Sequence, residues 1–351
     1  MTIDQNNQAT PVFAPNFNNP ATLLHACPAY HSTPLLEVEG LTHFSVRVKD
    51  ETQRMNLGSF KALGGVYAVF MLIAEQWKRQ TGRQLKASDF MAPEIRSFAQ
   101  SQVFVCASAG NHGLAVAAGA RLLGATARIY LSEKVPSSFE QRLCTCSADV
   151  VRSGSTYEDS FRAAIADSQE TGATLLADSS WSGYTRPPSL VMEGYTVIAE
   201  ELRQEFNQNN AWPTHVFLQA GVGGLAASIA YMIRHNWTVQ PHIVIVEPEA
   251  APCLQASHKA GFPVTVTGPA STMGRLDCKE PSILAFAALE QAGVEYCVIS
   301  DQLALHASGL LKAKGLPTTA SGAAGFAALM SMKETLNDSS KPLVIVTEGA
   351  L

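Results

Sequence analysis

The chain is sparing with charge and has no long apolar run. Only 16% of its 351 residues are charged, against about a quarter in an average domain. Subunit contacts cover surface that would otherwise carry charge, so we expect an oligomer, most simply a homodimer. No apolar stretch approaches the roughly 20 residues of a membrane span, so we expect no membrane association. A net charge of -5 provides no basic patch, so we expect no nucleic-acid partner.

Metal-site and export signatures are also missing. Cys144 and Cys146 have no second cysteine pair at zinc spacing, and no His-Glu-x-x-His occurs, so we expect no metal. The first residues are polar and lack the apolar core of a signal peptide. Without an export signal, an odd number of cysteines, here seven, indicates reduced thiols, so we expect a cytoplasmic protein.

What the sequence does contain is a regular alternation of strand and helix patterns. One series of strands is predicted at Val103 to Cys106, Ala127 to Leu131, Asp149 to Arg152 and Thr174 to Ala177. A second is predicted at Phe44 to Val48, Val216 to Leu218, Ile243 to Glu247, Glu295 to Ile299 and Leu343 to Val346. This order predicts an α/β fold of two doubly wound domains. We expect an N-terminal arm at 1–30, a large domain at 31–74 and 183–351, and a small domain at 75–182.

The segment Gly58 to Gly65 sets one lysine, Lys61, among small residues. A strand pattern precedes it and helical spacing from Val66 to Lys78 follows, so Lys61 lies near a helix N-terminus, where backbone amides favour an anion. An amine there can condense with the aldehyde of pyridoxal phosphate while the phosphate docks nearby. The alternative is a lysine whose apolar stem covers a half-buried helix.

A second candidate segment, Ala107 to Gly113, follows one strand pattern and precedes a helical one. Ser108 and the free amides of this turn can bind a substrate carboxylate, and the Asn111 amide can bind a cofactor hydroxyl. Asparagine and glycine also cap ordinary helices. His112 alone decides nothing, because a lone histidine in a turn is usually a cap or a packed polar group.

A third candidate segment, Gly221 to Gly224, follows a strand pattern. Glycines leave successive amides free to surround a phosphate at a helix start. The same spacing fits the dinucleotide fingerprint, and Glu247 at the end of the next strand fits the ribose contact of that motif. A nicotinamide-dependent dehydrogenase therefore stays open, although such an enzyme has no need for Lys61.

In this order and at this spacing, the three segments resemble the fold-type II pyridoxal-phosphate enzymes, which include serine and threonine dehydratases, serine racemase and tryptophan synthase β. The resemblance runs from about Thr33 to Gly349, and it implies two α/β domains with the cofactor in the cleft between them. The cofactor-binding residues that it implies are Lys61, Phe60, Asn111, Gly221, Val222, Gly223, Gly224 and Thr347. The substrate-binding residues are Ser108, Ala109, Gly110 and His112.

Finer details resemble one branch of that family, the diaminopropionate ammonia-lyases. The stretch Asp178 to Thr185 is similar to its Asp-Thr-x-Trp-x-Gly-Tyr-Thr segment, and Cys278 to Pro281 is similar to its Cys-Gly-Glu-Pro segment. The resemblance implies α,β-elimination from a small L-amino acid, with release of ammonia and a 2-keto acid. Lys61 then serves as base for the α-proton. Asp178 follows an apolar strand pattern and precedes an aromatic turn, where its carboxylate can either protonate the leaving group or cap a turn or helix.

One position departs from the branch. Ala109 stands where the branch has an aspartate, which acts as base on the D-substrate, so we expect only the L-isomer to react. The leaving group stays open, because L-serine, L-threonine or hydroxyaspartate can lose water through the same chemistry, and racemisation needs no elimination. Arg275 lies in a predicted loop near these segments, where it can meet a carboxylate or remain solvated.

Overall fold

The structure is a computed structural model that describes residues 12–40 and 42–350. Its strands are β1 (Leu35–Val38), β2 (Val46–Asp50), β3 (Val103–Ala107), β4 (Thr126–Leu131), β5 (Asp149–Arg152), β6 (Thr174–Leu175), β7 (His215–Gln219), β8 (His242–Pro248), β9 (Glu295–Ile299) and β10 (Pro342–Val346). Its helices are α1 (Asn19–His25), α2 (Lys61–Thr81), α3 (Pro93–Ala99), α4 (Asn111–Leu123), α5 (Ser137–Thr145), α6 (Tyr157–Thr171), α7 (Arg186–Asn209), α8 (Gly224–Asn236), α9 (Cys253–Ala260), α10 (Ile283–Ala292), α11 (Asp301–Ala313) and α12 (Ala324–Ser331). Short 3-10 turns lie at Arg54–Asn56, Ala87–Asp89 and Lys333–Thr335.

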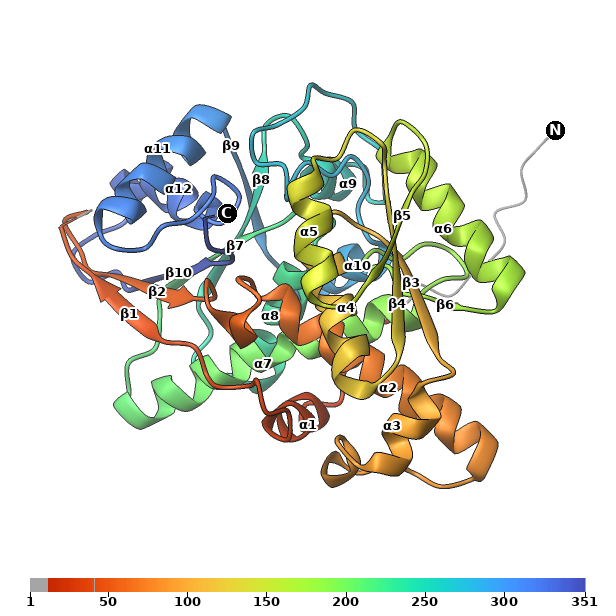
Figure 1. Cartoon of the computed structure of the whole chain (residues 1–351). Helices are drawn as coiled ribbons and strands as arrows, with labels where there is room; N and C mark the ends of the chain where they lie inside the picture. The colour runs from red at the N-terminus through yellow and green to blue at the C-terminus, as the bar shows by residue number, and fades with distance from the viewer. Residues whose placement is uncertain (1–11, 41, 351) are drawn as a thin grey trace.

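The strands form a six-stranded and a four-stranded sheet (Figure 1). The larger has the order β1-β2-β10-β7-β8-β9 and is parallel except for the β1–β2 pair. The smaller has the order β5-β4-β3-β6 and is parallel throughout. In Figure 1 the blue strand β10 lies beside the orange strand β2, so segments from early and late in the chain pair in one sheet. The predicted α/β class is confirmed.

Helices cover both faces of each sheet, because successive strand residues point to opposite sides. In β7, Val216 and Leu218 pack toward α7, α8 and α10, whereas Phe217 packs toward α11 and α12. In β3, Phe104 and Cys106 join the core that contains α4, whereas Val105 packs toward α6. The central strands β3, β7, β8 and β10 are therefore buried on both sides, which explains why they read as near-continuous apolar runs.

The sequence predicted nine of the strands, and their observed first and last residues differ from the predicted ones by about two positions at most. The antiparallel edge strand β1 was not predicted, because its four residues, Leu35 to Val38, carry little periodic signal. Strand β2 continues through Lys49 and Asp50, which were expected to end it. Lys49 Nζ forms an ion pair with Glu201 Oε2 at 2.6 Å, so the charged side chain is tolerated inside the fold.

The predicted domain boundaries remain predictions. The four-stranded sheet uses residues 103–175, within the expected small domain, but the boundary at residue 74 falls inside α2, which packs on both α4 and α7. Part of the predicted arm, residues 1–11, lies outside the described residues. In the remainder of the arm, α1 packs on α7 and α2 of its own chain, and Leu23 and Leu24 join the core.

Two adjacent glycines let α2 approach a neighbour on each side. A methyl group on Gly64 would lie 2.4 Å from the Tyr195 ring in α7, and one on Gly65 would lie 2.5 Å from Ala115 Cβ in α4. Carbon atoms that are not bonded pack best at about 3.5–4.0 Å. The glycines therefore set the spacing of three helices at the first turn of α2, which begins with Lys61.

We expect Gly65→Ala to lower the free energy of unfolding by about 3 kcal/mol, because overpacking two touching helices shifts their backbones. Urea unfolding followed by circular dichroism measures this change. Gly309→Ala in α11 is the matched control, since no atom of the described chain lies within 4 Å of the added methyl group. Helix propensity should make that variant more stable by about 1 kcal/mol or less. Equal stability of the two variants would contradict the close approach of α2 and α4.

Candidate active site

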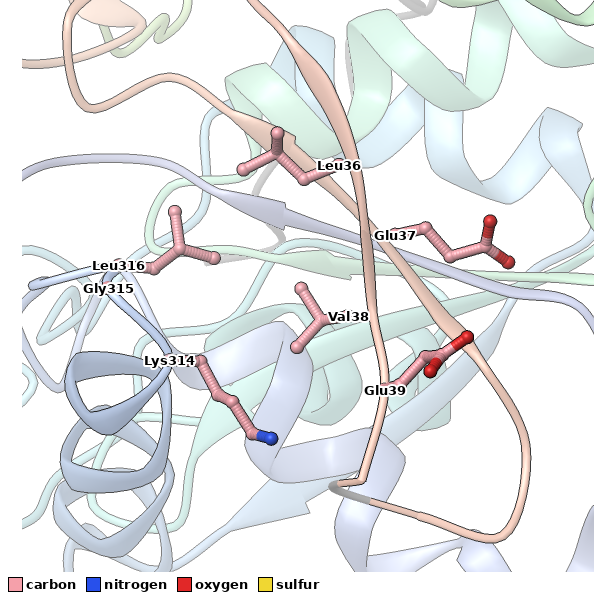
Figure 2. Close-up of a pocket in the computed structure, with 7 residues that line it drawn as sticks. All are labelled: Leu36, Glu37, Val38, Glu39, Lys314, Gly315 and Leu316. Carbon is pink, nitrogen blue, oxygen red and sulfur yellow. The ribbon is translucent and has the colours of Figure 1, made fainter.

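A surface hollow of about 330 Å³ lies between β1 and the turn after α11 (Figure 2). It is lined by Leu36, Glu37, Val38, Glu39, Lys314, Gly315 and Leu316. In Figure 2 the Leu36 and Val38 side chains point toward Leu316, whereas those of Glu37 and Glu39 point away from it. The residues predicted to bind the cofactor and to act in catalysis lie elsewhere, around Lys61, the first residue of α2. That second place is the candidate active site.

Lys61 and Asp178 form an ion pair, in which Lys61 Nζ donates a hydrogen bond to Asp178 Oδ2. The two side chains are 22% and 29% exposed, so both are reachable from solvent. Burial alone lowers the pKa of Lys61, but the attraction of the Asp178 carboxylate outweighs it, and the net pKa lies above its ordinary value. Burial raises the pKa of Asp178, but Lys61 outweighs that effect and the net pKa is lowered. The pair is therefore an ammonium and a carboxylate.

Two aromatic rings hold the stem of Lys61. Its Nζ lies 5.3 Å from the centre of the Phe60 ring and 5.7 Å from that of Tyr195. These rings pack edge to face, with centres 4.9 Å apart. The buried Tyr195 hydroxyl makes no well-formed hydrogen bond among residues 12–40 and 42–350, although Lys61 lies close enough to oppose the rise in its pKa that burial causes. A buried polar atom without a partner is costly, so this hydroxyl is suited to bind a group that enters the site.

Asn111 is the first residue of α4, and its Nδ2 donates a hydrogen bond to Glu348 Oε2. Thr319 Oγ1 donates to the other oxygen, Glu348 Oε1, at 2.5 Å. A backbone bridge also joins Ser59 to Glu348, so the segment before Lys61 touches the end of the chain. Sequence reasoning did not propose Glu348 for the site, although it directly follows Thr347.

Thr347 comes at the end of β10, and its Oγ1 accepts a hydrogen bond from Gln219 Nε2 at 3.3 Å. The Thr347 carbonyl accepts from the Phe60 amide at 3.1 Å, which ties it to the lysine segment. Gln219, the last residue of β7, is buried and was also missed, because it lies inside an apolar run. The neutral Thr347 hydroxyl, held by the neutral Gln219 amide, thus lies where β7 and β10 end.

The glycine loop connects β7 to α8, a helix of 13 residues. Gly223 has φ +99°, a left-handed conformation that side chains disfavour, and an added methyl group would also lie 3.0 Å from Leu254. The Val222 carbonyl accepts a hydrogen bond from Ser282 N at 3.0 Å, which anchors the loop. Free amides at the start of α8 then suit a phosphate.

The turn before α4 is fixed by local hydrogen bonds. Ser108 Oγ accepts from Gly110 N at 3.3 Å, and half-buried Ala109 lies between them. His112 Nε2 donates to the Leu176 carbonyl at 2.9 Å, so that nitrogen carries the proton. Burial lowers the pKa of His112, which keeps the ring neutral. The structure thus uses one His112 nitrogen for packing, and a substrate contact by this residue remains a prediction.

Asp178 is followed by an aromatic turn. The rings of Trp181 and Tyr184 stack with centres 4.2 Å apart, and a backbone bridge joins the two residues. The Tyr184 hydroxyl donates to the Leu175 carbonyl at 2.8 Å and accepts from Ala177 N at 3.0 Å. These contacts tie the turn to the end of β6 and hold Asp178 beside Lys61.

The site therefore combines an amine, a glycine loop at a helix start and a neutral hydroxyl at strand ends. A family profile described as "Pyridoxal-phosphate dependent enzyme" matches residues 27–348, almost the whole chain. The chain belongs to this family. The enzyme therefore uses pyridoxal phosphate, as the sequence predicted, and the residues gathered around Lys61 fit that cofactor.

Individual relatives agree with this assignment. The enzyme is 30% identical to diaminopropionate ammonia-lyase of Escherichia coli strain K12, over 98% of this chain and 91% of that one. It is 34% identical to diaminopropionate ammonia-lyase of Salmonella typhimurium strain LT2, over 81% of this chain and 72% of that one. The Escherichia coli ammonia-lyase in complex with an aminoacrylate-PLP azomethine reaction intermediate has a similar structure, with a TM-score of 0.82, 29% identity, and 98% and 91% of the two chains covered. The predicted fold-type II architecture is thereby confirmed.

The dinucleotide interpretation of the glycine loop was wrong. Both carboxylate oxygens of Glu247 accept backbone hydrogen bonds at the start of α9, from Leu254 N at 2.7 Å and Gln255 N at 2.8 Å. The side chain is fully buried, and burial raises its pKa to about 7. Glu247 therefore caps the start of α9 with both of its oxygens, so it is not available to bind a ribose hydroxyl.

Within the described ranges, no helix is both long and apolar enough to cross a membrane.

Proposed function

We propose that the enzyme is an ammonia-lyase that catalyses α,β-elimination from a small L-amino acid, with release of ammonia and a 2-keto acid. The pairing of Lys61 with Asp178 carries this proposal, because it places a base for the α-proton next to a group that can serve the leaving group. The similarity to diaminopropionate ammonia-lyases over nearly the whole chain supports the same chemistry.

The residues that would hold the cofactor follow from their positions. Lys61 Nζ would bind the aldehyde, beside the Phe60 ring, and the free amides of Gly221, Val222, Gly223 and Gly224 would bind the phosphate. Asn111 Nδ2 would turn from Glu348 to the ring hydroxyl, and Thr347 Oγ1 would face the ring nitrogen. When bound, the cofactor supplies a ring that accepts the electron pair left on the substrate's α-carbon.

The substrate would lie between the two sheets. Ser108 Oγ and the amides of Ala109 and Gly110 would bind its α-carboxylate. The site residues from both sheets meet there, which supports the predicted division into a small and a large domain with the cofactor between them. A homodimer in the cytoplasm remains part of the proposal.

The ion pair also suggests how the proton moves. Lys61 Nζ, once displaced by the substrate's amine, takes the α-proton and becomes an ammonium. Because Nζ is hydrogen-bonded to Asp178 Oδ2, that proton can pass to the carboxylate and from there to the leaving amine or hydroxyl. The proton lost by the α-carbon thus leaves with the β-substituent, and Lys61 returns to its starting state.

Ala109 predicts which enantiomer reacts. We expect the L-isomers of 2,3-diaminopropionate and serine to react at least tenfold faster than the D-isomers, because only Lys61 is placed to take the α-proton. Release of ammonia and of keto acid from both isomers of each compound tests the function and the stereochemistry together. Ala109→Asp should raise the rate on the D-isomer, while Ala109→Asn is the matched control without a base. Equal turnover of both enantiomers by the parent enzyme would contradict the assignment of a single base.

A further inference from the structure

The guanidinium of Arg275 lies at the site, and its Nη1 and Nη2 donate no hydrogen bond to any described residue. The segment of Arg275 packs on the glycine loop, since a methyl group on Gly221 would lie 3.1 Å from the Arg275 carbonyl. The side chain is 33% exposed, and its Nε is buried without a hydrogen-bond partner among the described residues. A guanidinium has five N–H donors, and leaving buried donors unpaired is costly. Arg275 therefore has donors to offer a ligand.

The surroundings of Arg275 fix the position of its charge. Its Cζ lies 5.8 Å from the centre of the Phe139 ring, and its backbone amide donates to Ser321 Oγ at 3.1 Å. A methyl group on Gly110 would lie 3.3 Å from Nη1, so the guanidinium rests against the turn that is proposed to bind the substrate's carboxylate. Its positive charge is thus held beside the bound amino acid.

The carboxylates nearby are already engaged. Asp178 pairs with Lys61, and each oxygen of Glu348 accepts a hydrogen bond, from Asn111 or from Thr319. Glu348 Oε2 forms an ion pair with Arg275 Nε at 3.5 Å, which engages this nitrogen but not Nη1 or Nη2. Ala109 adds no further carboxylate to this turn. Arg275 Nε is thus paired with Glu348, whereas Nη1 and Nη2 donate no hydrogen bond within residues 12–40 and 42–350.

We propose that Arg275 recognises a second anionic group on the substrate, and that the preferred substrates are amino dicarboxylates with a leaving group on the β-carbon, such as L-3-hydroxyaspartate. The inference rests on the proposed elimination and narrows its substrate class. A guanidinium binds a carboxylate through two parallel N–H···O bonds, whereas it repels the side-chain ammonium of diaminopropionate. In the reaction the Cα–H and Cβ–O bonds break and a Cα=Cβ bond forms. Water departs, and hydrolysis of the resulting enamine releases ammonia and a keto dicarboxylate.

Equilibrium binding to the holoenzyme tests this recognition without turnover. L-Aspartate and L-alanine differ by one carboxylate and lack a hydroxyl or amino leaving group, and binding of each changes the visible absorbance of the cofactor. We expect the parent to bind L-aspartate at least tenfold more tightly than L-alanine. Arg275→Gln should weaken L-aspartate binding at least tenfold and change L-alanine binding less than twofold. Arg275→Lys keeps the charge but loses the paired donors. Its affinity for L-aspartate should therefore lie between that of the parent and that of Arg275→Gln.

Arg79→Gln is the matched control, because Arg79 is an exposed arginine in the last turn of α2. It should leave both affinities unchanged. Cofactor content and thermal unfolding of each variant show that it is folded. If Arg275→Gln weakened the binding of L-aspartate and L-alanine equally, the proposal would be overturned, because the guanidinium would then bind the α-carboxylate that both ligands share. Unchanged binding of both ligands would overturn it as well.

Turnover provides the second arm of the test. We expect the parent's kcat/KM to be at least tenfold higher for L-3-hydroxyaspartate than for L-serine or L-2,3-diaminopropionate, and Arg275→Gln to remove this preference. A higher kcat/KM for L-2,3-diaminopropionate would overturn the proposed substrate class. If no compound is eliminated but Arg275 still selects L-aspartate, the proposed lyase function fails and the recognition stands. The two failures are thus distinguishable.

Discussion

Lys61→Ala is expected to abolish turnover of every substrate, by roughly three orders of magnitude or more, while the protein stays folded. The amine is proposed both to bind the cofactor and to take the α-proton, so its loss removes two functions at once. Ammonia release measures the rate, and borohydride reduction followed by peptide mass spectrometry locates the cofactor. The label should lie on Lys61 in the parent and be absent from the variant.

Lys259→Ala is a suitable control, because Lys259 is an exposed lysine in α9 whose Nζ contacts only Gln255 among the described residues. It should retain full activity and the same labelled peptide. Near-normal turnover by Lys61→Ala would remove Lys61 from the mechanism, and labelling at another lysine would misplace the cofactor.

Asp178→Asn is expected to lower kcat for L-serine and L-2,3-diaminopropionate by about 10²- to 10⁴-fold, with a smaller change in KM. The amide is nearly isosteric but cannot pass a proton from Lys61 Nζ to the leaving group. Because Lys61 lowers the pKa of Asp178 despite burial, the parent enters the reaction with Asp178 as a carboxylate. Steady-state kinetics on both substrates measure the effect.

A substrate with a different leaving group separates the proton relay from a structural role. Chloride departs from L-β-chloroalanine without being protonated, so Asp178→Asn should slow this compound far less than serine. Lys61→Ala should slow both compounds alike, because each must still lose its α-proton. An equal effect of Asp178→Asn on both compounds would contradict the relay and leave Asp178 only the role of holding Lys61 in place.

Local pattern was enough to predict the elements of this fold. Buried strands must carry apolar residues, and helices with one buried face must repeat them every three to four residues, so β2 to β10 were visible in the sequence. Lys61 and Gly221 to Gly224 were also predictable, because a lysine among small residues and a glycine loop after a strand are local signals. The edge strand β1 was not predicted, since its four residues carry no clear period.

Partners distant in the chain were not predictable in this way. Lys61 and Asp178 are separated by 117 positions, and Asn111 and Glu348 by 237. No local pattern records that their strands end at the same place. Gln219 was hidden for a related reason, because a polar residue within an apolar run looks like an exception until its neighbours are known.

The sequence by itself therefore determined the α/β order and the family, and it pointed to Lys61 as the proposed cofactor lysine, because each depends on residues within a few positions of one another. The tertiary structure decided how these residues are used. It paired Lys61 with a carboxylate, turned Glu247 into a helix cap, and placed the Arg275 guanidinium beside Gly110 with open donors. Such outcomes depend on which strand ends and loops meet after the sheets assemble, and on the requirement that buried charges find partners there.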